Sequence, residues 1–165
     1  MKSFSDWVQE DHMEGGYWVG SSGHGASGIL PIAADTKNIC LAWRNESVAQ
    51  GDCYGTIGGA ITEGTPEKSA IQELREETGY RGTIKCQKAF VFKDGSFQYH
   101  NFIGIVPHEF EFKPESDAAW ETDYIRWMSY GDIVDKMKTE SHDFHPGLIR
   151  LFRESKRLIE SLIHE

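Results

Sequence analysis

The chain has 165 residues, of which 39% are hydrophobic and 26% are charged. Seventeen Lys and Arg stand against twenty-six Asp and Glu, and the formal net charge of −9 argues against nucleic acid duplexes and anionic membrane surfaces as partners. Because a chain of about 150 residues buries roughly 70% of its unfolded surface, we expect a single domain over residues 1–165 that needs no disulfide framework.

The N-terminal part is polar and ends in a stretch rich in glycine and serine. Residues 1–28 are predicted to form an N-terminal extension, and the segment from Gly20 to Gly28 breaks any helical or strand period. Two roles fit this segment, a flexible connector and a ligand-contacting loop, and its composition favours the connector.

Short β-prone runs follow the extension. The expected strands are residues 29–33, 39–43, 53–59, 84–92, 96–106 and 124–128. Turn residues 35–38 predict a hairpin between the first two strands, and the Asp94-Gly95 pair predicts a second hairpin between aromatic-rich arms. The third strand runs into paired glycines, which indicates a sharp turn or a close approach of the backbone to another group.

Three helices are expected, over residues 66–78, 132–138 and 146–164. The first has the clearest boundaries, because Thr65 can cap it, Pro66 suits its first position and Gly79 ends it. The last helix carries apolar residues at helical spacing between charges, so one of its sides should pack on the domain.

Three glutamates share one side of the first predicted helix. At 100° per residue, Glu73, Glu76 and Glu77 fall within an arc of about 100°, where like charges repel by roughly 0.2–0.5 kcal/mol per pair. Glu76 and Glu77 also lie near the negative end of the helix dipole. A divalent cation would turn this repulsion into binding, since carboxylates are hard ligands for Mg²⁺ or Mn²⁺. The alternative is a solvated charged face, partly neutralised by Arg75 and Lys68.

The surrounding segment, GGAITEGTPEKSAIQELREETGY from Gly58 to Tyr80, resembles the signature box of the Nudix hydrolases, GX5EX7REUXEEXGU, in which U is a bulky apolar residue. The second half matches closely, with ELREETGY in place of EUXEEXGU. The chain is one residue short between Gly64 and Thr65, where the family's first glutamate would lie, and Gln72 replaces the family's arginine. These two residues tend to pair in the family, so losing both leaves no orphaned charge.

The resemblance implies an α+β fold, an α/β/α sandwich in which a mixed β-sheet is flanked by helices. It also implies that Glu73, Glu76 and Glu77 coordinate Mg²⁺ or Mn²⁺ together with the carbonyl of Gly58. A glutamate outside the box often completes this site or acts as the general base. Glu121 is our candidate, six residues before the segment Trp127-Met128-Ser129. An ordinary loop carboxylate is the alternative, and the rivals of Glu121 are Glu109, Glu111 and Glu115.

The implied activity is attack by water on one phosphorus of a nucleoside diphosphate that is linked to another moiety, such as a nucleotide or a sugar. Glu121 and Glu76 remain alternative bases. The cation would also explain how an acidic protein binds an anionic substrate. Two other functions stay open: a non-catalytic nucleotide-binding or regulatory domain of the same fold, and a diphosphate isomerase. The retained carboxylates favour catalysis, because a domain that only binds has no need of three mutually repelling charges.

Substrate contacts have to come from outside the box. The aromatic candidates for stacking on a base are Trp18, Tyr54, Phe97 and Tyr99, although aromatic residues on strands more often belong to a core. Arg44 and Arg126 are candidates for phosphate binding, with a surface ion pair as the alternative use.

The compartment follows from cysteine usage. The three cysteines are an odd number without CxxC spacing, and the acidic N-terminus lacks the apolar core of a signal peptide. We therefore expect a cytoplasmic protein. The resemblance implies a small nucleotide derivative as its partner. A homodimer is a further possibility that the family suggests.

Overall fold

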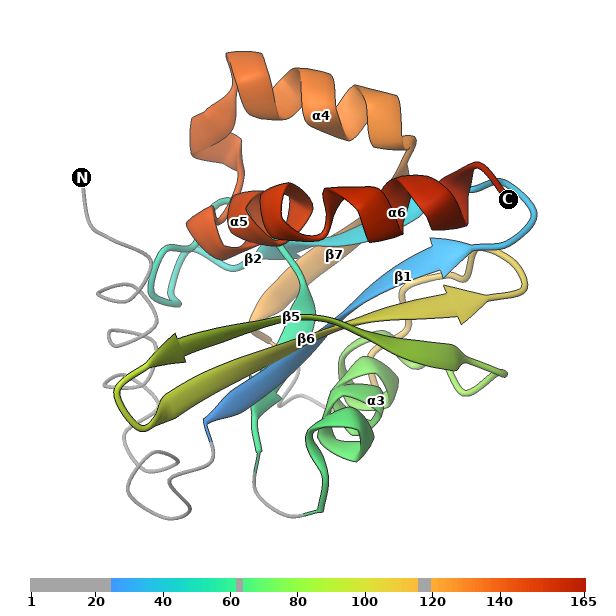
Figure 1. The fold of residues 1–165 in the computed structure, drawn as a ribbon. Coiled ribbons are helices and arrows are strands. Elements are labelled where there is room, and N and C mark those ends of the chain that lie inside the picture. The colour runs from blue at the N-terminus through green and yellow to red at the C-terminus, as the bar shows by residue number, and fades with distance from the viewer. Residues whose placement is uncertain (1–24, 62–63, 116–119) are drawn as a thin grey trace.

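The computed structural model describes residues 25–61, 64–115 and 120–165, and shows a mixed sheet between two layers of helices (Figure 1). The strands are β1 (Ala26–Ala33), β2 (Ile39–Arg44), β3 (Tyr54–Gly55), β4 (Ile57–Ala60), β5 (Lys85–Asp94), β6 (Phe97–Val106) and β7 (Thr122–Met128). The helices are α3 (Pro66–Thr78), α4 (Tyr130–Thr139), the short 3₁₀ helix η2 (Ser141–Asp143), α5 (Pro146–Glu154) and α6 (Lys156–Ile163).

The seven strands form one sheet in the order β3-β2-β1-β6-β5, with β4 also paired to β1 and β7 to β2. The central pair β1 and β6 is parallel, and the other pairs are antiparallel. Helix α3 covers one side of this sheet, which we call the α3 face. Helices α4, α5 and α6 lie on the other side, the α4–α6 face (Figure 1). The predicted α+β fold, an α/β/α sandwich with a mixed sheet, is confirmed.

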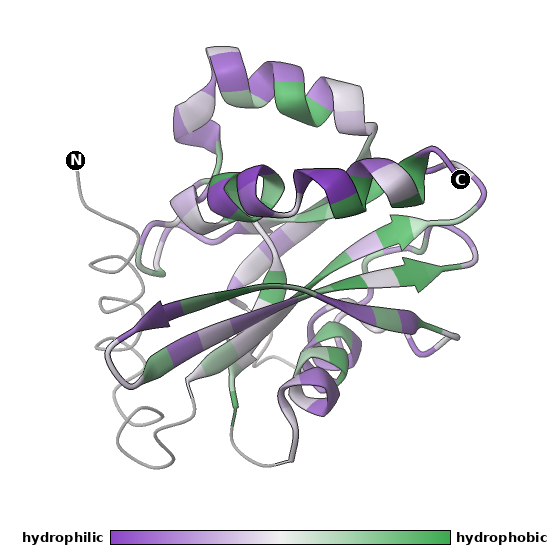
Figure 2. Ribbon diagram, viewed as in Figure 1, coloured by the Kyte–Doolittle hydropathy of each residue, from purple (hydrophilic) through white to green (hydrophobic). Residues whose placement is uncertain are grey.

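Both faces of the sheet are buried, because successive side chains of a strand point in opposite directions. On β1, Ile29 belongs to the core cluster of the α3 face, whereas Leu30 and Ile32 belong to the larger cluster under α4–α6. Figure 2 shows hydrophobic residues along the strands of the sheet, and alternating hydrophobic and hydrophilic residues along α5 and α6. The two hairpins, β1–β2 and β5–β6, are confirmed.

The structure differs from the sequence predictions most clearly in three places. Strand β1 begins at Ala26, so residues 26–28 of the expected extension belong to the sheet, while residues 1–24 lie outside the described part. The expected strand over 53–59 is two short strands, β3 and β4, that pair with different neighbours. The expected helix over 146–164 is two helices that meet at Ser155, whose φ of −108° and ψ of 21° depart from helical geometry.

No helix in the described ranges is long and apolar enough to cross a membrane. Cys40, Cys53 and Cys86 form no disulfide.

Candidate active site

Helix α3 holds the box glutamates on a rigid element with well-defined ends. The Thr65 hydroxyl accepts a hydrogen bond from the Lys68 N–H at 3.2 Å, and Pro66 occupies the first turn. At the other end Gly79 has a φ of 80°, and its N–H donates to the Arg75 carbonyl. The predicted bounds 66–78 and both caps are confirmed.

Two of the three box glutamates point toward the sheet. Glu77 is buried, with 7% of its surface exposed, and Glu73 is half-buried one helical turn earlier. The carboxylate of Glu73 lies against Gly59 of β4, where an added Cβ would stand 2.9 Å from its Cδ atom. The close approach predicted at the paired glycines is therefore made by a metal-ligand candidate.

Among the described residues, the charge of these two carboxylates is largely uncompensated. Burial, with repulsion from Glu76 and Glu121, raises the pKa of Glu73 from 4.5 to about 7. Burial, followed by repulsion from Glu73 and Glu121, raises the pKa of Glu77 well above its usual value, and the positive charge of Arg44 only partly opposes this shift. A cation placed beside them would favour the charged forms of both groups.

Glu76 has a different environment from its two neighbours. Its side chain is exposed, and its Oε1 atom accepts a hydrogen bond from Gln72 Nε2 at 2.7 Å. Within the described ranges, no three acidic, histidine or cysteine side chains lie close enough together to hold one ion. An ion bound by all three box glutamates would thus require Glu76 to rotate away from Gln72, which its exposure permits. The buried carboxylates are hard oxygen donors short of positive charge, so the donor set fits Mg²⁺ or Mn²⁺.

Glu121 is the outer glutamate that the structure brings to the box. It directly precedes β7, and its carbonyl accepts a hydrogen bond from the N–H of Asn45, which directly follows β2. This pairing places its charge near enough to Glu73 and Glu77 to raise the pKa of both groups. Sequence reasoning had no signal for the Asn45 contact, because it depends on which strands pair.

The rival glutamates have partners elsewhere. Glu109 accepts a hydrogen bond from Asn38, Glu111 lies 3.3 Å from the Lys113 ammonium, and Glu115 binds the Arg81 guanidinium through both oxygens. Their contacts favour Glu121 as the candidate outside the box.

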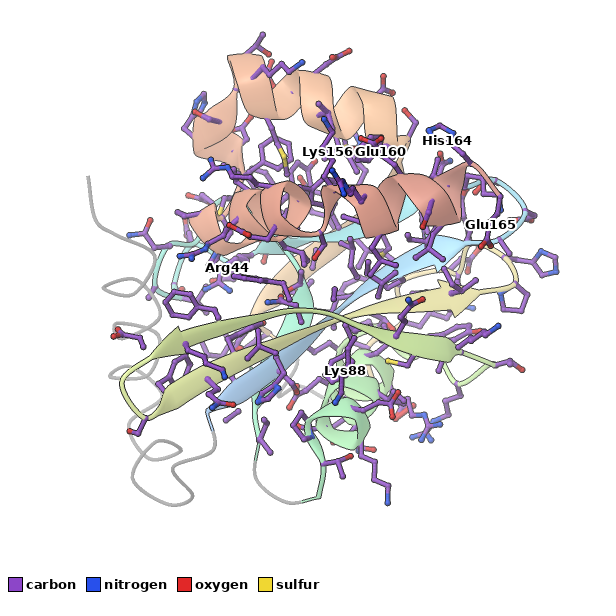
Figure 3. All side chains as sticks on the ribbon, in the orientation of Figure 1. Arg44, Lys88, Lys156, Glu160, His164 and Glu165 are labelled. Carbon is purple, nitrogen blue, oxygen red and sulfur yellow. The ribbon has the colours of Figure 1, made fainter. Side chains whose placement is uncertain are left out.

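Arg44, labelled in Figure 3, is the last residue of β2. Its Nη2 and Nε atoms donate to the carbonyls of Ala49 (2.6 Å) and Gln50 (3.2 Å), which holds the loop after β2. Its charge also acts on Glu77. The structure therefore places the charge of Arg44, a predicted phosphate contact, near the carboxylates. Two of its guanidinium nitrogens also hold the loop after β2.

Tyr54 and Arg126 lie on the other face of the sheet. Tyr54 packs edge to face against Trp43 within the α4–α6 cluster, with ring centroids 4.7 Å apart. Arg126 pairs in register with Leu41 of the same cluster, and its Nη1 donates to the Tyr54 hydroxyl at 3.4 Å. The structure thus separates these two candidates from the box glutamates, and their substrate roles stay predictions.

Of the remaining candidates, Trp18 lies outside the described residues, and Gly58, Phe97 and Tyr99 are near the beginning of β1. The Tyr99 hydroxyl lies where a Cβ on Gly28 or Gly58 would be, and it hydrogen-bonds Thr56 at 3.3 Å. Ile29 points to α3, so a Cβ on its neighbour Gly28 would point to the opposite face of the sheet. The Tyr99 side chain reaches that position and therefore lies on the opposite face as well. Phe97 is half-buried at the start of β6. The aromatic rings therefore lie across the sheet from the carboxylates.

The comparison with protein families decides the identity. A sequence model of the NUDIX domain matches residues 23–152. The chain belongs to the Nudix family. The resemblance seen in the box is thereby confirmed, and the match extends over β1 and α5, well beyond the box itself.

Curated relatives share about a quarter of the residues. The ADP-ribose pyrophosphatase of Saccharomyces cerevisiae is 26% identical over 143 residues, which cover 84% of this chain and 60% of the relative. The putative 8-oxo-dGTP diphosphatase 3 of Mycobacterium tuberculosis is 25% identical over 142 residues, covering 79% and 59%. The chain thus spans only about three fifths of the length of these relatives.

Solved structures share the Nudix fold. A Nudix hydrolase from M. smegmatis, RenU, superposes with a TM-score of 0.64 at 19% identity, over 84% of this chain and 86% of that one. The bifunctional NMN adenylyltransferase/ADP ribose pyrophosphatase from Francisella tularensis, complexed with AMP and a Mn ion, gives 0.61 at 19% identity over 96% and 47%. The NUDIX domain of Shewanella oneidensis NrtR, complexed with ADP ribose, gives 0.55 at 10% identity over 81% and 86%.

Proposed function

We propose that this Nudix protein is a metal-dependent hydrolase that cleaves the diphosphate linkage of a nucleoside diphosphate joined to another moiety. The observation that carries the proposal is the pair Glu73 and Glu77, held against the sheet by α3 with raised pKa values and Glu121 nearby. Acidic groups in such surroundings are typical of functional sites, because they oppose folding unless a ligand compensates them.

Glu73, Glu77 and a rotated Glu76, with the Gly58 carbonyl, would hold the Mg²⁺ or Mn²⁺. When bound, the cation supplies the positive charge that attracts the diphosphate and lowers the pKa of a water molecule. The Mn ion in the Francisella tularensis neighbour supports this choice of metal. The rigid helix and its caps keep the ligands in place between turnovers.

We assign the general base to Glu121. Its side chain is exposed and can pass a proton on to solvent, whereas Glu76, once rotated away from Gln72, would serve as a metal ligand. The Asn45 N–H anchors the Glu121 backbone, so its carboxylate can reach the same place repeatedly. Arg44 would contribute a phosphate contact from β2.

ADP-ribose is the first substrate to test, because a curated relative and a fold neighbour are named for it. The second is 8-oxo-dGTP, after the mycobacterial relatives. Other nucleotide sugars complete the panel of nucleoside diphosphate compounds.

The deciding experiment measures turnover of this panel with and without Mg²⁺, in wild type and in Glu121→Gln. We expect Mg²⁺-dependent release of two phosphorylated products, and a large loss of kcat in the variant. Binding without turnover of any compound would instead support the non-catalytic alternative. Rearrangement without uptake of water would support the isomerase.

Other attributes stay predictions. We propose a single domain over residues 1–165 in the cytoplasm, with no nucleic acid duplex or membrane as a partner. Sedimentation of the pure protein would test the suggested homodimer.

A further inference from the structure

A serine on β1 stands out because its hydroxyl is fully buried and has no hydrogen-bond partner. Ser27 has 0% of its surface exposed, and its Oγ is one of two such side-chain atoms in the described ranges; the other is Ser155 Oγ. Buried polar groups nearly always have partners, so each exception calls for an explanation.

The strand pairing places Ser27 beside the box glutamates. Ser27 is the direct partner of Gly59 in the antiparallel pair of β1 and β4. Directly opposed residues share one face of the sheet, with Cβ atoms about 4.5–5.5 Å apart. The Cβ position at Gly59 lies 2.9 Å from the Glu73 Cδ atom. The Ser27 hydroxyl and the Glu73 carboxylate therefore border the same small space under α3.

A neighbour on the same strand shows on which face of the sheet Ser27 lies. Ile29, two residues after Ser27, packs in the core cluster with Ala70 and Leu74 of α3. Side chains two residues apart on a strand point to the same side. Ser27 thus points toward α3, into the layer that contains Glu73.

The chemistry of the two groups is complementary. A serine hydroxyl offers one donor, and an ionised carboxylate accepts it strongly through a charge-assisted hydrogen bond. The competing acceptor is His100, which is half-buried and pairs with Ser27 across the parallel strands β1 and β6. A neutral imidazole is a weaker acceptor than a charged carboxylate, so the hydroxyl should donate its hydrogen bond to Glu73.

We propose that the Ser27 hydroxyl positions Glu73 by donating a hydrogen bond to its carboxylate. This inference rests on the proposed function, since it concerns Glu73 as a metal ligand. Partners of this kind orient carboxylate ligands and affect metal affinity without touching the metal. Ser27 is therefore a positioning residue.

Ser155 provides a matched control. It is also a buried serine with an unpartnered hydroxyl, but it lies at the junction of α5 and α6 on the opposite face. The test measures the Kd of Mn²⁺ for the whole protein by electron paramagnetic resonance, without substrate. We expect Ser27→Ala to weaken Mn²⁺ binding by about tenfold, and Ser155→Ala to leave the Kd unchanged. Both variants should keep the melting temperature of the metal-free wild type or exceed it.

A double-variant cycle separates positioning from a general structural effect. In the Glu73→Gln background, Ser27→Ala should cause no further loss of Mn²⁺ affinity, since the group that Ser27 orients is already altered. An equal further loss there, or wild-type affinity in Ser27→Ala alone, would overturn the role of Ser27 and leave the proposed function standing. Failure of wild type itself to bind Mn²⁺ would overturn both.

Discussion

The two faces of the sheet are built from the same strands and yet differ in the side chains that their helices contribute. The α4–α6 face is packed almost wholly with apolar groups, among them Leu148, Leu151 and Ile159, each 2% exposed or less. On the α3 face, the helix places Glu73 and Glu77 in line with apolar Ala70 and Leu74. One face supplies most of the stabilisation, so the other can carry charges that oppose folding and serve a ligand.

The largest expected effect is a loss of activity when a charge is removed from the α3 face. Glu77→Gln should lower kcat/KM by about 100-fold or more, because a metal ligand contributes several kcal/mol to the transition state. The control is Glu154→Gln at the exposed end of α5, which should keep full activity. Equal activity in the two variants would show that Glu77 is no ligand.

Removing apolar volume from the α4–α6 face should reduce stability and leave metal binding unchanged. Leu151 is 0% exposed, and Leu151→Ala should reduce the free energy of unfolding by about 2–5 kcal/mol. Urea titration measures this change, and the Kd of Mn²⁺ at a temperature where the variant stays folded should match that of wild type. A change in the Kd would mean that the two faces are coupled.

Gly58 and Gly59 of β4 sharpen the contrast between the two faces, because a Cβ added at each would point to a different face of the sheet. A Cβ at Gly59 would meet the flexible end of Glu73, so Gly59→Ala should displace the carboxylate and reduce activity about tenfold with little loss of stability. A Cβ at Gly58 would stand 2.3 Å from the Ser27 carbonyl oxygen, so Gly58→Ala should mainly destabilise the fold. Thermal unfolding and steady-state kinetics on both variants check this division.

The pH dependence of metal-free stability reports on a single charge of the α3 face. The pKa of Glu73 is raised from 4.5 to about 7 in the folded chain, so the folded state holds this proton more tightly than the unfolded state. The stabilisation is therefore complete below about pH 4.5 and is lost as pH rises toward 7, on the order of 3 kcal/mol. Urea unfolding at several pH values should show this part of the decline in wild type and not in Glu73→Gln. Identical pH profiles for the two proteins would contradict the raised pKa.

Local signals in the sequence were sufficient for much of the fold. Thr65, Pro66 and Gly79 marked both ends of α3, since capping depends on neighbouring residues. The Asp94-Gly95 pair marked the β5–β6 hairpin, and Gly95 has the expected positive φ of 59°. The break at Ser155 and the division between β3 and β4 had no local signal, because both depend on contacts with other elements.

For the site, the box revealed the helix and its glutamates, because their spacing and type are themselves the signal. Glu121 was chosen from its spacing before Trp127-Met128-Ser129, and the pairing of β2 with β7 is what brings its charge near Glu73 and Glu77. Ser27 was hidden in a stretch whose composition resembles a linker, and only its pairing with Gly59 connects it to Glu73.

The sequence by itself thus determined the family, the helix that carries the carboxylates and the repulsion among them, since all three follow from residues close together in the chain. Only the tertiary structure decided which carboxylates are buried and which candidates lie across the sheet. Burial and proximity depend on strands far apart in the sequence, whose pairing no local pattern specifies.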